Sequence, residues 1–207
     1  MERKHGVMQR VMTVVFLPVI LFLAQAGGAA PPGEKAAVAS LREVVDAKLL
    51  LDGDYFTALL NGIDRAREEI SLSIYLFRTI ENTQGCPEAV LKSLIAAVGR
   101  GVRVEAILEQ NQNADDLSRN NAETAQRLRQ GGIRVCLDAP DRQTHTKLVV
   151  IDRRYVLIGS HNLTQSALKY NHEASVWIDS APLAEEALRY MKSLCPDERK
   201  KTGKRRK

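Results

Sequence analysis

The sequence contains few cysteines and few aromatic residues. The cysteines are not spaced for a zinc site, and the aromatic residues are not spaced for stacking on nucleic-acid bases. The cysteines are Cys86, Cys136 and Cys195 in a chain of 207 residues. No CxxC pair occurs, and no cysteine lies near a histidine at metal-ligand spacing, so the sequence does not indicate a zinc site. One pair could form a disulfide in an exported chain, but the sequence does not say which. We favour the interpretation that all three are small buried residues.

Aromatic residues make up 5% of the chain. They do not alternate with basic residues in the kind of strip that holds single-stranded nucleic acid. Tyr75 and Phe77 could approach a site from a strand end, although a core position is the more usual one for Phe77. Arg78 could contact phosphate, and the polar segment 109–113 could form a rim. The sequence therefore does not predict a surface on which aromatic side chains stack on nucleic-acid bases.

The N-terminus lacks an apolar run long enough to span a bilayer. Residues 11–24 are apolar but number 14 and include Pro18, whereas a span needs about 20. Basic residues precede this run, and Ala24-Gln25-Ala26 follows as a cleavage site. We therefore predict a cleaved signal peptide over residues 1–26 and a periplasmic or secreted protein. The alternative is a membrane anchor formed by an uncleaved N-terminal segment.

The net charge of +5 is unevenly distributed. Residues 1–26 contribute +2 and residues 196–207 contribute +5, which leaves −2 for the rest of the chain. We predict a linker over residues 27–40, which are rich in Ala, Gly and Pro, and a solvated basic tail over residues 196–207. Because the positive charge is terminal, net charge alone does not identify a nucleic-acid-binding protein.

Residues 41–195 are predicted to form one domain with an α/β fold. Apolar strand patterns at 47–53, 70–77, 102–108 and 133–137 alternate with amphipathic helix patterns, the first of which Asp54 could cap. A hairpin, a strand at 174–179 and a closing helix follow. This order predicts a layered fold with a mixed, largely parallel central sheet.

The hairpin at 145–162, HTKLVVIDRRYVLIGSHN, has polar residues at its open end. His145 and Lys147 lie on one face of the first strand because side chains alternate, and Ser160 and Asn162 have the same spacing on the return strand. Imidazole can attack phosphorus or transfer a proton, while lysine and asparagine can hold phosphate oxygens. We therefore predict His145, Lys147, Ser160 and Asn162 as catalytic residues.

Three further residues complete this prediction. Asp152 lies more than about 15 Å from His145 along an extended strand, so we interpret it as a turn residue that binds backbone N–H groups. Gly159 would let a ligand approach the backbone. The acid that orients His145 must come from elsewhere, and Glu173 at the start of the next strand is the candidate.

The pattern His145-x-Lys147-x4-Asp152-x6-Gly159-Ser160-x-Asn162 resembles the HKD signature of the phospholipase D superfamily. The size of the chain and its secretory start make the domain similar to the small bacterial Nuc-type endonucleases of that superfamily. The resemblance implies an α/β/α fold and a phosphodiesterase that needs no metal or cofactor. It also implies that one histidine forms a phosphohistidine and a second histidine protonates the leaving oxygen.

The sequence contains one such motif, so the second histidine must have another source. Strand alternation turns His161 away from the site, and His172 is less certain. We therefore predict a homodimer that brings two copies of His145 together. The predicted substrate is DNA or RNA. The alternatives are a phospholipase D-type enzyme or phosphatidyl transferase that acts on phospholipid, and a non-catalytic module that has kept the fold.

Overall fold

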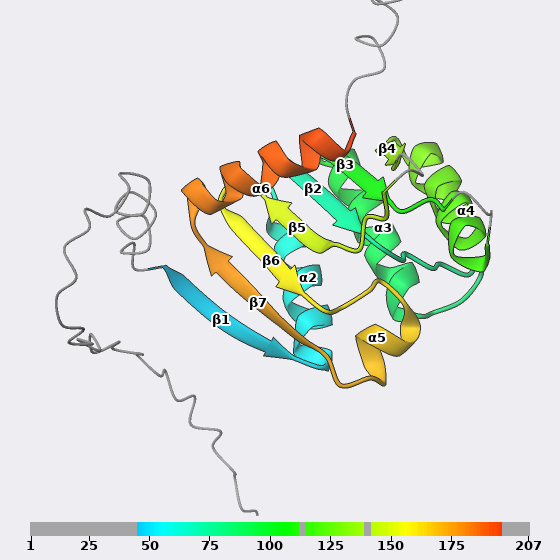
Figure 1. The fold of residues 1–207 in the computed structure, drawn as a ribbon, viewed down its shortest axis with the longest axis horizontal. Helices are drawn as coiled ribbons and strands as arrows, with labels where there is room; N and C mark the ends of the chain where they lie inside the picture. The colour runs from blue at the N-terminus through cyan, green and yellow to red at the C-terminus, as the bar shows by residue number, and fades with distance from the viewer. Residues whose placement is uncertain (1–44, 112–114, 139–141, 196–207) are drawn as a thin grey trace, which may run out of the picture. The chain divides into compact units, whose positions relative to one another are not determined.

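The computed structural model describes residues 45–111, 115–138 and 142–195 (Figure 1). The predicted signal peptide at 1–26, the linker at 27–40 and the tail at 196–207 lie outside the described residues. Strands and helices alternate along most of the described chain: β1 Asp46–Leu51, α2 Gly53–Arg65, β2 Glu69–Ile74, α3 Cys86–Gly99, β3 Arg103–Leu108, α4 Asp116–Gln130, β4 Arg134–Leu137, β5 Lys147–Ile151, β6 Tyr155–Gly159, α5 Gln165–Lys169, β7 Ala174–Asp179 and α6 Ala181–Leu194.

The strands form one seven-stranded sheet in the order β1-β7-β6-β5-β2-β3-β4. The α/β fold with a mixed sheet is confirmed, but the prediction that the sheet is largely parallel was wrong. Only β2–β3 and β3–β4 are parallel among the described strand pairs. The others are antiparallel because the β5–β6 hairpin joins the sheet beside β2, and β7 and β1 extend the sheet from β6.

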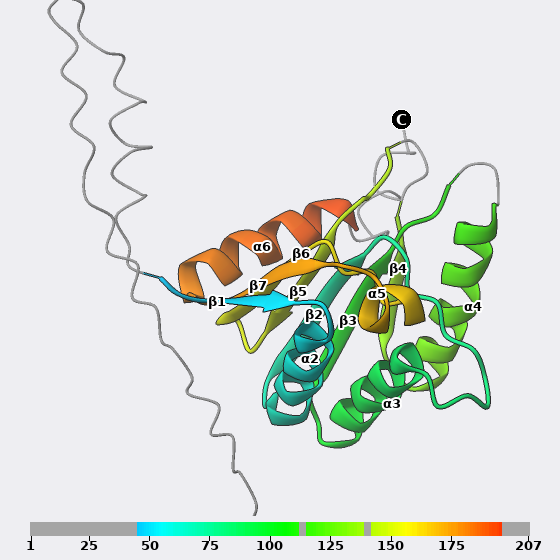
Figure 2. The same ribbon diagram turned by 90° about the horizontal axis from the view of Figure 1, so that it is seen from below.

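Helices cover both faces of the sheet, which gives three layers (Figure 2). The larger core lies between the sheet and helices α2, α3, α4 and α5, and includes Leu59, Leu94 and Leu128. The smaller core lies under α6 and includes Val150, Val156 and Met191. Strand β5 is buried along its whole length because it lies between these two cores.

Side-chain caps define the starts of several helices. Asp115 accepts a hydrogen bond from the Ser118 N–H at the start of α4, and Ser180 accepts one from the Leu183 N–H at the start of α6. Helix α2 differs from the prediction. Asp54 lies inside its first turn, and the capping position is Asp52, whose positive φ of 48° turns the chain out of β1.

A disulfide joins Cys136 in β4 to Cys195 just after α6. The interpretation of these two cysteines as unpaired buried residues was therefore wrong. Their separation of 59 residues is bridged because α6 crosses the sheet face toward β4. Cys86, at the start of α3, is free.

Candidate active site

The predicted catalytic residues lie at or next to the start of β5, the end of β6 and the start of β7. Figure 1 shows that these three points lie on one side of the sheet. The antiparallel register pairs Leu148 with Ile158 and Ile151 with Tyr155. Lys147 and Ser160 therefore lie at the same end of the hairpin, and the turn at Asp152 lies at the other end. The arrangement of the hairpin follows the sequence prediction.

His145 and Lys147 contact each other directly. The Lys147 Nζ lies 3.3 Å from Nδ1 and 3.3 Å from Nε2 of the His145 ring, and it donates a hydrogen bond of 3.0 Å to the His145 carbonyl. His145 is exposed, whereas Lys147 is only 8% exposed. Burial lowers the pKa of Lys147 below its usual value, and the negative charge of Glu173 partly opposes this shift. The pair thus presents an accessible imidazole beside a desolvated cation.

Tyr75, just after β2, forms one wall of this pair. Its ring centroid lies 4.4 Å from that of His145, and the Lys147 Nζ lies 4.8 Å from the same ring. A cation over an aromatic face is favourable. Tyr75 was considered as a residue near the site, but strand periodicity could not show that it packs against His145.

Asn121 in α4 fixes the chain segment that carries Tyr75, and the sequence analysis missed it. The Asn121 side chain is fully buried and binds three backbone groups. It accepts from the Phe77 N–H at 2.9 Å and donates to the carbonyl of Tyr75 at 2.8 Å and of Glu109 at 2.9 Å. It therefore ties the ends of β2 and β3 together behind the site. No local pattern marks it, because all three partners are distant in sequence.

Glu109 supports the segment that leads into His145. Its buried carboxylate accepts a hydrogen bond of 2.5 Å from the N–H of Thr144. Burial raises the pKa of Glu109, the hydrogen bond from Thr144 opposes this, and the nearby charge of Asp138 adds to the rise. The hydroxyl of Thr144 donates to Asp138. Glu109, which belongs to the polar segment 109–113 predicted to lie at the rim of the site, is thus buried and holds the backbone before His145.

Glu173 binds different partners from those predicted. Its carboxylate accepts hydrogen bonds from the hydroxyl of Ser160 and, at 3.2 Å, from the amide of Asn171. In the described part of the chain, no hydrogen bond joins Glu173 to His145. Within one chain, therefore, Glu173 holds Ser160 rather than orienting His145, and this corrects the predicted role.

Asn162 has a side-chain oxygen without a hydrogen-bond partner among the described residues. Gly159 packs against β7 and does not face a ligand. The Oδ1 of Asn162 is buried and has no hydrogen-bond partner among the described residues, so this amide is not fully bound by the fold. At Gly159, a Cβ atom would come within 2.2 Å of the Ser175 Oγ and 2.4 Å of the Ala174 carbonyl. The glycine therefore allows β6 to pack against β7, and the prediction that it admits a ligand was wrong.

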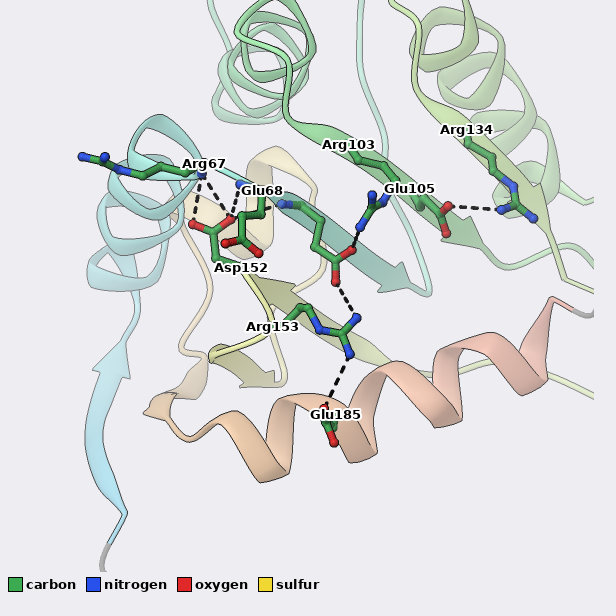
Figure 3. Close-up of polar contacts among 9 residues, drawn as sticks. Arg67, Glu68, Arg103, Glu105, Arg134, Asp152, Arg153 and Glu185 are labelled. Atoms are coloured by element: carbon green, nitrogen blue, oxygen red, sulfur yellow. Dashed lines mark hydrogen bonds and ion pairs between the residues drawn. The ribbon is translucent and has the colours of Figure 1, made fainter.

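Asp152 has the structural role that was predicted (Figure 3). Its carboxylate accepts hydrogen bonds from the backbone N–H groups of Arg67, Glu68 and Glu69, at distances of 2.8 to 3.1 Å. Arg67 and Glu68 lie between α2 and β2, and Glu69 is the first residue of β2. Asp152 therefore anchors the hairpin turn to the start of the neighbouring strand.

The other two histidines of the described chain contact residues outside the predicted catalytic set. His161 is fully buried, stacks on Tyr55 at 4.2 Å and bonds to the Ser175 hydroxyl and the Asp52 carbonyl. This agrees with the prediction that it faces away from the site. His172 is exposed and lies 3.4 Å from the Asp52 carboxylate. Phe77 is a buried core residue, as expected.

Two further features of the described chain bear on ligands and membranes. Among these residues, no three His, Cys, Asp or Glu side chains lie close enough together to hold a metal ion. No helix in the same ranges has the length and apolar character needed to cross a membrane.

Comparison with known proteins places the chain in a family. The domain family described as "Cardiolipin synthase, PLD-like domain" matches residues 59–195. The chain therefore belongs to the phospholipase D superfamily. It is 32% identical over 131 residues to a "Phospholipase D" of Rickettsia felis, a match that covers 63% of this chain and 58% of that protein. The chain thus aligns with less than two thirds of that relative's length.

Two solved structures have a fold similar to that of this chain. The structure of Nuc from Salmonella typhimurium, titled a phospholipase D family member, is 25% identical with a TM-score of 0.62, and the match covers 72% of this chain and 93% of Nuc. NucT from Helicobacter pylori is 20% identical with a TM-score of 0.57, and the match covers 72% of this chain and 95% of NucT. The second likeness concerns the fold alone.

Proposed function

We propose that the protein is a phosphodiesterase that cleaves DNA or RNA at a site shared by two copies of the chain. The observation that carries this proposal is the pairing of exposed His145 with buried Lys147 in a domain that spans nearly all of Nuc. The resemblance of the motif to Nuc-type endonucleases supports a nucleic-acid substrate.

In the proposed reaction, a ring nitrogen of His145 attacks phosphorus and the bond to the leaving oxygen breaks. His145 of a second copy donates a proton to that oxygen. The phosphohistidine is then hydrolysed when water, having lost a proton to the second histidine, attacks phosphorus and releases His145. The Nζ of Lys147 and the Nδ2 of Asn162 donate hydrogen bonds to the non-bridging oxygens as charge shifts in the transition state. No step needs a metal or cofactor.

An apolar patch beside the site supports the proposed homodimer. Leu49 is 59% exposed, Leu51 50% and Ile158 47%. The register puts Leu49 and Ile158 on either side of Val176, so they lie on one sheet face. This is the face that α6 covers in part (Figure 2). Burying the patch against a second copy is favourable and would take place close to the residues that need a partner.

A lipid substrate is the second candidate. It is favoured by the matching family's description as cardiolipin synthase and by the name of the Rickettsia felis relative. The same His145 and Lys147 would then act on a phospholipid headgroup. Export to the periplasm or beyond remains part of the proposal, and the Cys136–Cys195 disulfide supports it because disulfides persist in oxidising compartments. Anchoring by the N-terminal segment is the alternative location.

The test is hydrolysis by the purified chain of plasmid, single-stranded DNA and RNA, with and without EDTA, beside a His145→Ala variant. We expect cleavage that resists EDTA and is lost in the variant. Cleavage abolished by EDTA would contradict the metal-independent reaction. Release of headgroup from phosphatidylcholine vesicles without any nuclease activity would favour the lipid substrate.

A further inference from the structure

A cleft lies beside α2, near the end of the β5–β6 hairpin that is opposite His145. It has a volume of about 530 Å³ and is lined by α2, β1, β7 and the hairpin turn. The five residues of β5 separate the two ends of the hairpin. At the rise of an extended strand, this corresponds to roughly 16 Å. None of the predicted catalytic residues lines this cleft.

Two aromatic side chains form one wall of the cleft. Trp177 and Tyr155 are half-buried, with ring centroids 5.3 Å apart. Gly62 in α2 makes room for this arrangement, since a Cβ there would come within 2.9 Å of Trp177 Cη2. Part of each ring packs on the larger core, and part lines the cleft. A flat ring could therefore stack there.

Three cationic residues line the same cleft. Lys48 stands across from Trp177 in the β1–β7 register, Arg65 ends α2, and Arg67 follows it. Within residues 45–111, 115–138 and 142–195, none of the three forms an ion pair. By contrast, Arg153 and Arg154 nearby are each bonded to a carboxylate.

The one acid in the lining, Asp152, forms no ion pair with these three cations. The Asp152 carboxylate is held by three backbone N–H groups, and the Arg67 side chain points away from it (Figure 3). The cleft therefore combines an aromatic wall with excess positive charge. A quaternary amine would be repelled, an inorganic anion would not use the rings, and a neutral apolar ligand would not use the cations.

We propose that this cleft binds one nucleotide unit of a nucleic-acid strand. The base stacks on Trp177, and the phosphate lies among Lys48, Arg65 and Arg67. The identification of the ligand as part of a strand rests on the proposed nuclease function. The volume suits one nucleotide, because small-ligand pockets commonly measure about 300–1,000 Å³. A nucleic-acid strand bound both here and at His145 would run between the two ends of the β5–β6 hairpin.

Trp177 is the only tryptophan of the chain, so its fluorescence reports on this cleft directly. The full chain carrying His145→Ala, which should not cleave its ligand, is titrated with adenosine monophosphate and with a single-stranded oligodeoxyadenylate. We expect saturable quenching by both, with tighter binding of the oligonucleotide. Inorganic phosphate should compete with the monophosphate without quenching.

The Arg65→Ala/Arg67→Ala double variant should bind the oligonucleotide about tenfold more weakly and with a smaller salt dependence. Arg189→Ala is the matched control, since this exposed arginine lies on α6 across the sheet. Trp177→Phe, followed by anisotropy of a labelled oligonucleotide, should lose about fivefold or more in affinity.

Absence of quenching by both adenine ligands, or equal weakening in Arg189→Ala, would overturn the proposal. A shift of Trp177 emission caused only by anionic phospholipid vesicles would overturn it in favour of a lipid surface. The nuclease assay is independent of these results. Quenching without nuclease activity would leave the cleft as a nucleotide site and contradict the proposed function, whereas nuclease activity without quenching would do the reverse.

Discussion

The two ends of the β5–β6 hairpin both carry charged side chains, but the chain satisfies them differently. At the turn, Asp152 binds three backbone N–H groups, and Arg153 and Arg154 pair with carboxylates. At the open end, His145 is exposed, and the buried Lys147 Nζ contacts the ring and carbonyl of His145 but forms no ion pair among the described residues. Charged side chains that are paired within the fold indicate a structural role, whereas an exposed nucleophile beside a desolvated cation indicates a ligand site.

The largest expected effect is at the open end. His145→Ala should reduce phosphodiester cleavage by about 10⁴-fold or more, because no other group in the proposed site can replace the nucleophile. The free energy of unfolding should hardly change, since the side chain is exposed. Steady-state kinetics and urea unfolding of the same preparation check both. Cleavage at the wild-type rate would reassign the nucleophile.

Asp152→Ala should show the opposite pattern. We expect a loss of about 2–3 kcal/mol in the free energy of unfolding, because hydrogen bonds to a charged acceptor are lost and N–H groups are left without it. Asp152→Asn keeps one acceptor oxygen and should lose less. The folded protein should retain its activity at low temperature. A stable but inactive Asp152→Ala variant would mean that the turn takes part in the chemistry.

His161, next to Asn162, should give stability a pH dependence. Burial lowers the pKa of His161 below its usual 6.5, and the hydrogen bond to Asp52 and the charges of Glu173 and Asp52 oppose this only in part. The stability contributed by neutral His161 is therefore present above pH 6.5 and is lost as the pH falls through the lower folded-state pKa.

The advantage of wild type over His161→Gln should thus shrink in urea unfolding from about pH 8 to about pH 5. His172→Gln, at an exposed position, is the control. An advantage of wild type that grows on acidification would show that His161 is charged in the folded protein.

The smallest effect is expected at Arg153, which has a positive φ of 52°. Arg153→Gly relieves backbone strain of about 1 kcal/mol but loses ion pairs with Glu69 and Glu185, whose exposed arginine limits them to about 1 kcal/mol or less. These terms nearly cancel, so we expect a change within about 1 kcal/mol by urea unfolding. A loss above about 2 kcal/mol would show that the ion pairs dominate at the turn.

The sequence predicts the hairpin well because strand alternation and turn spacing are local. The same reasoning correctly gives Asp152 backbone N–H partners at the turn and turns His161 away from His145. It fails where tertiary packing decides. The contacts of Tyr75 and Asn121, the bond between Glu173 and Ser160, and the Cys136–Cys195 disulfide all join distant segments. Strand direction was also misjudged, because the hairpin enters the middle of the sheet.

The most direct test of the account is a subunit-mixing experiment on the shared site. Wild-type chain and His145→Ala chain are mixed in equal amounts, allowed to exchange, and assayed at constant total protein. If each site needs His145 from two copies, only wild-type pairs are active, and activity should fall to about one quarter of that of the wild type. Activity of about one half would show that each chain works alone and would contradict the shared site.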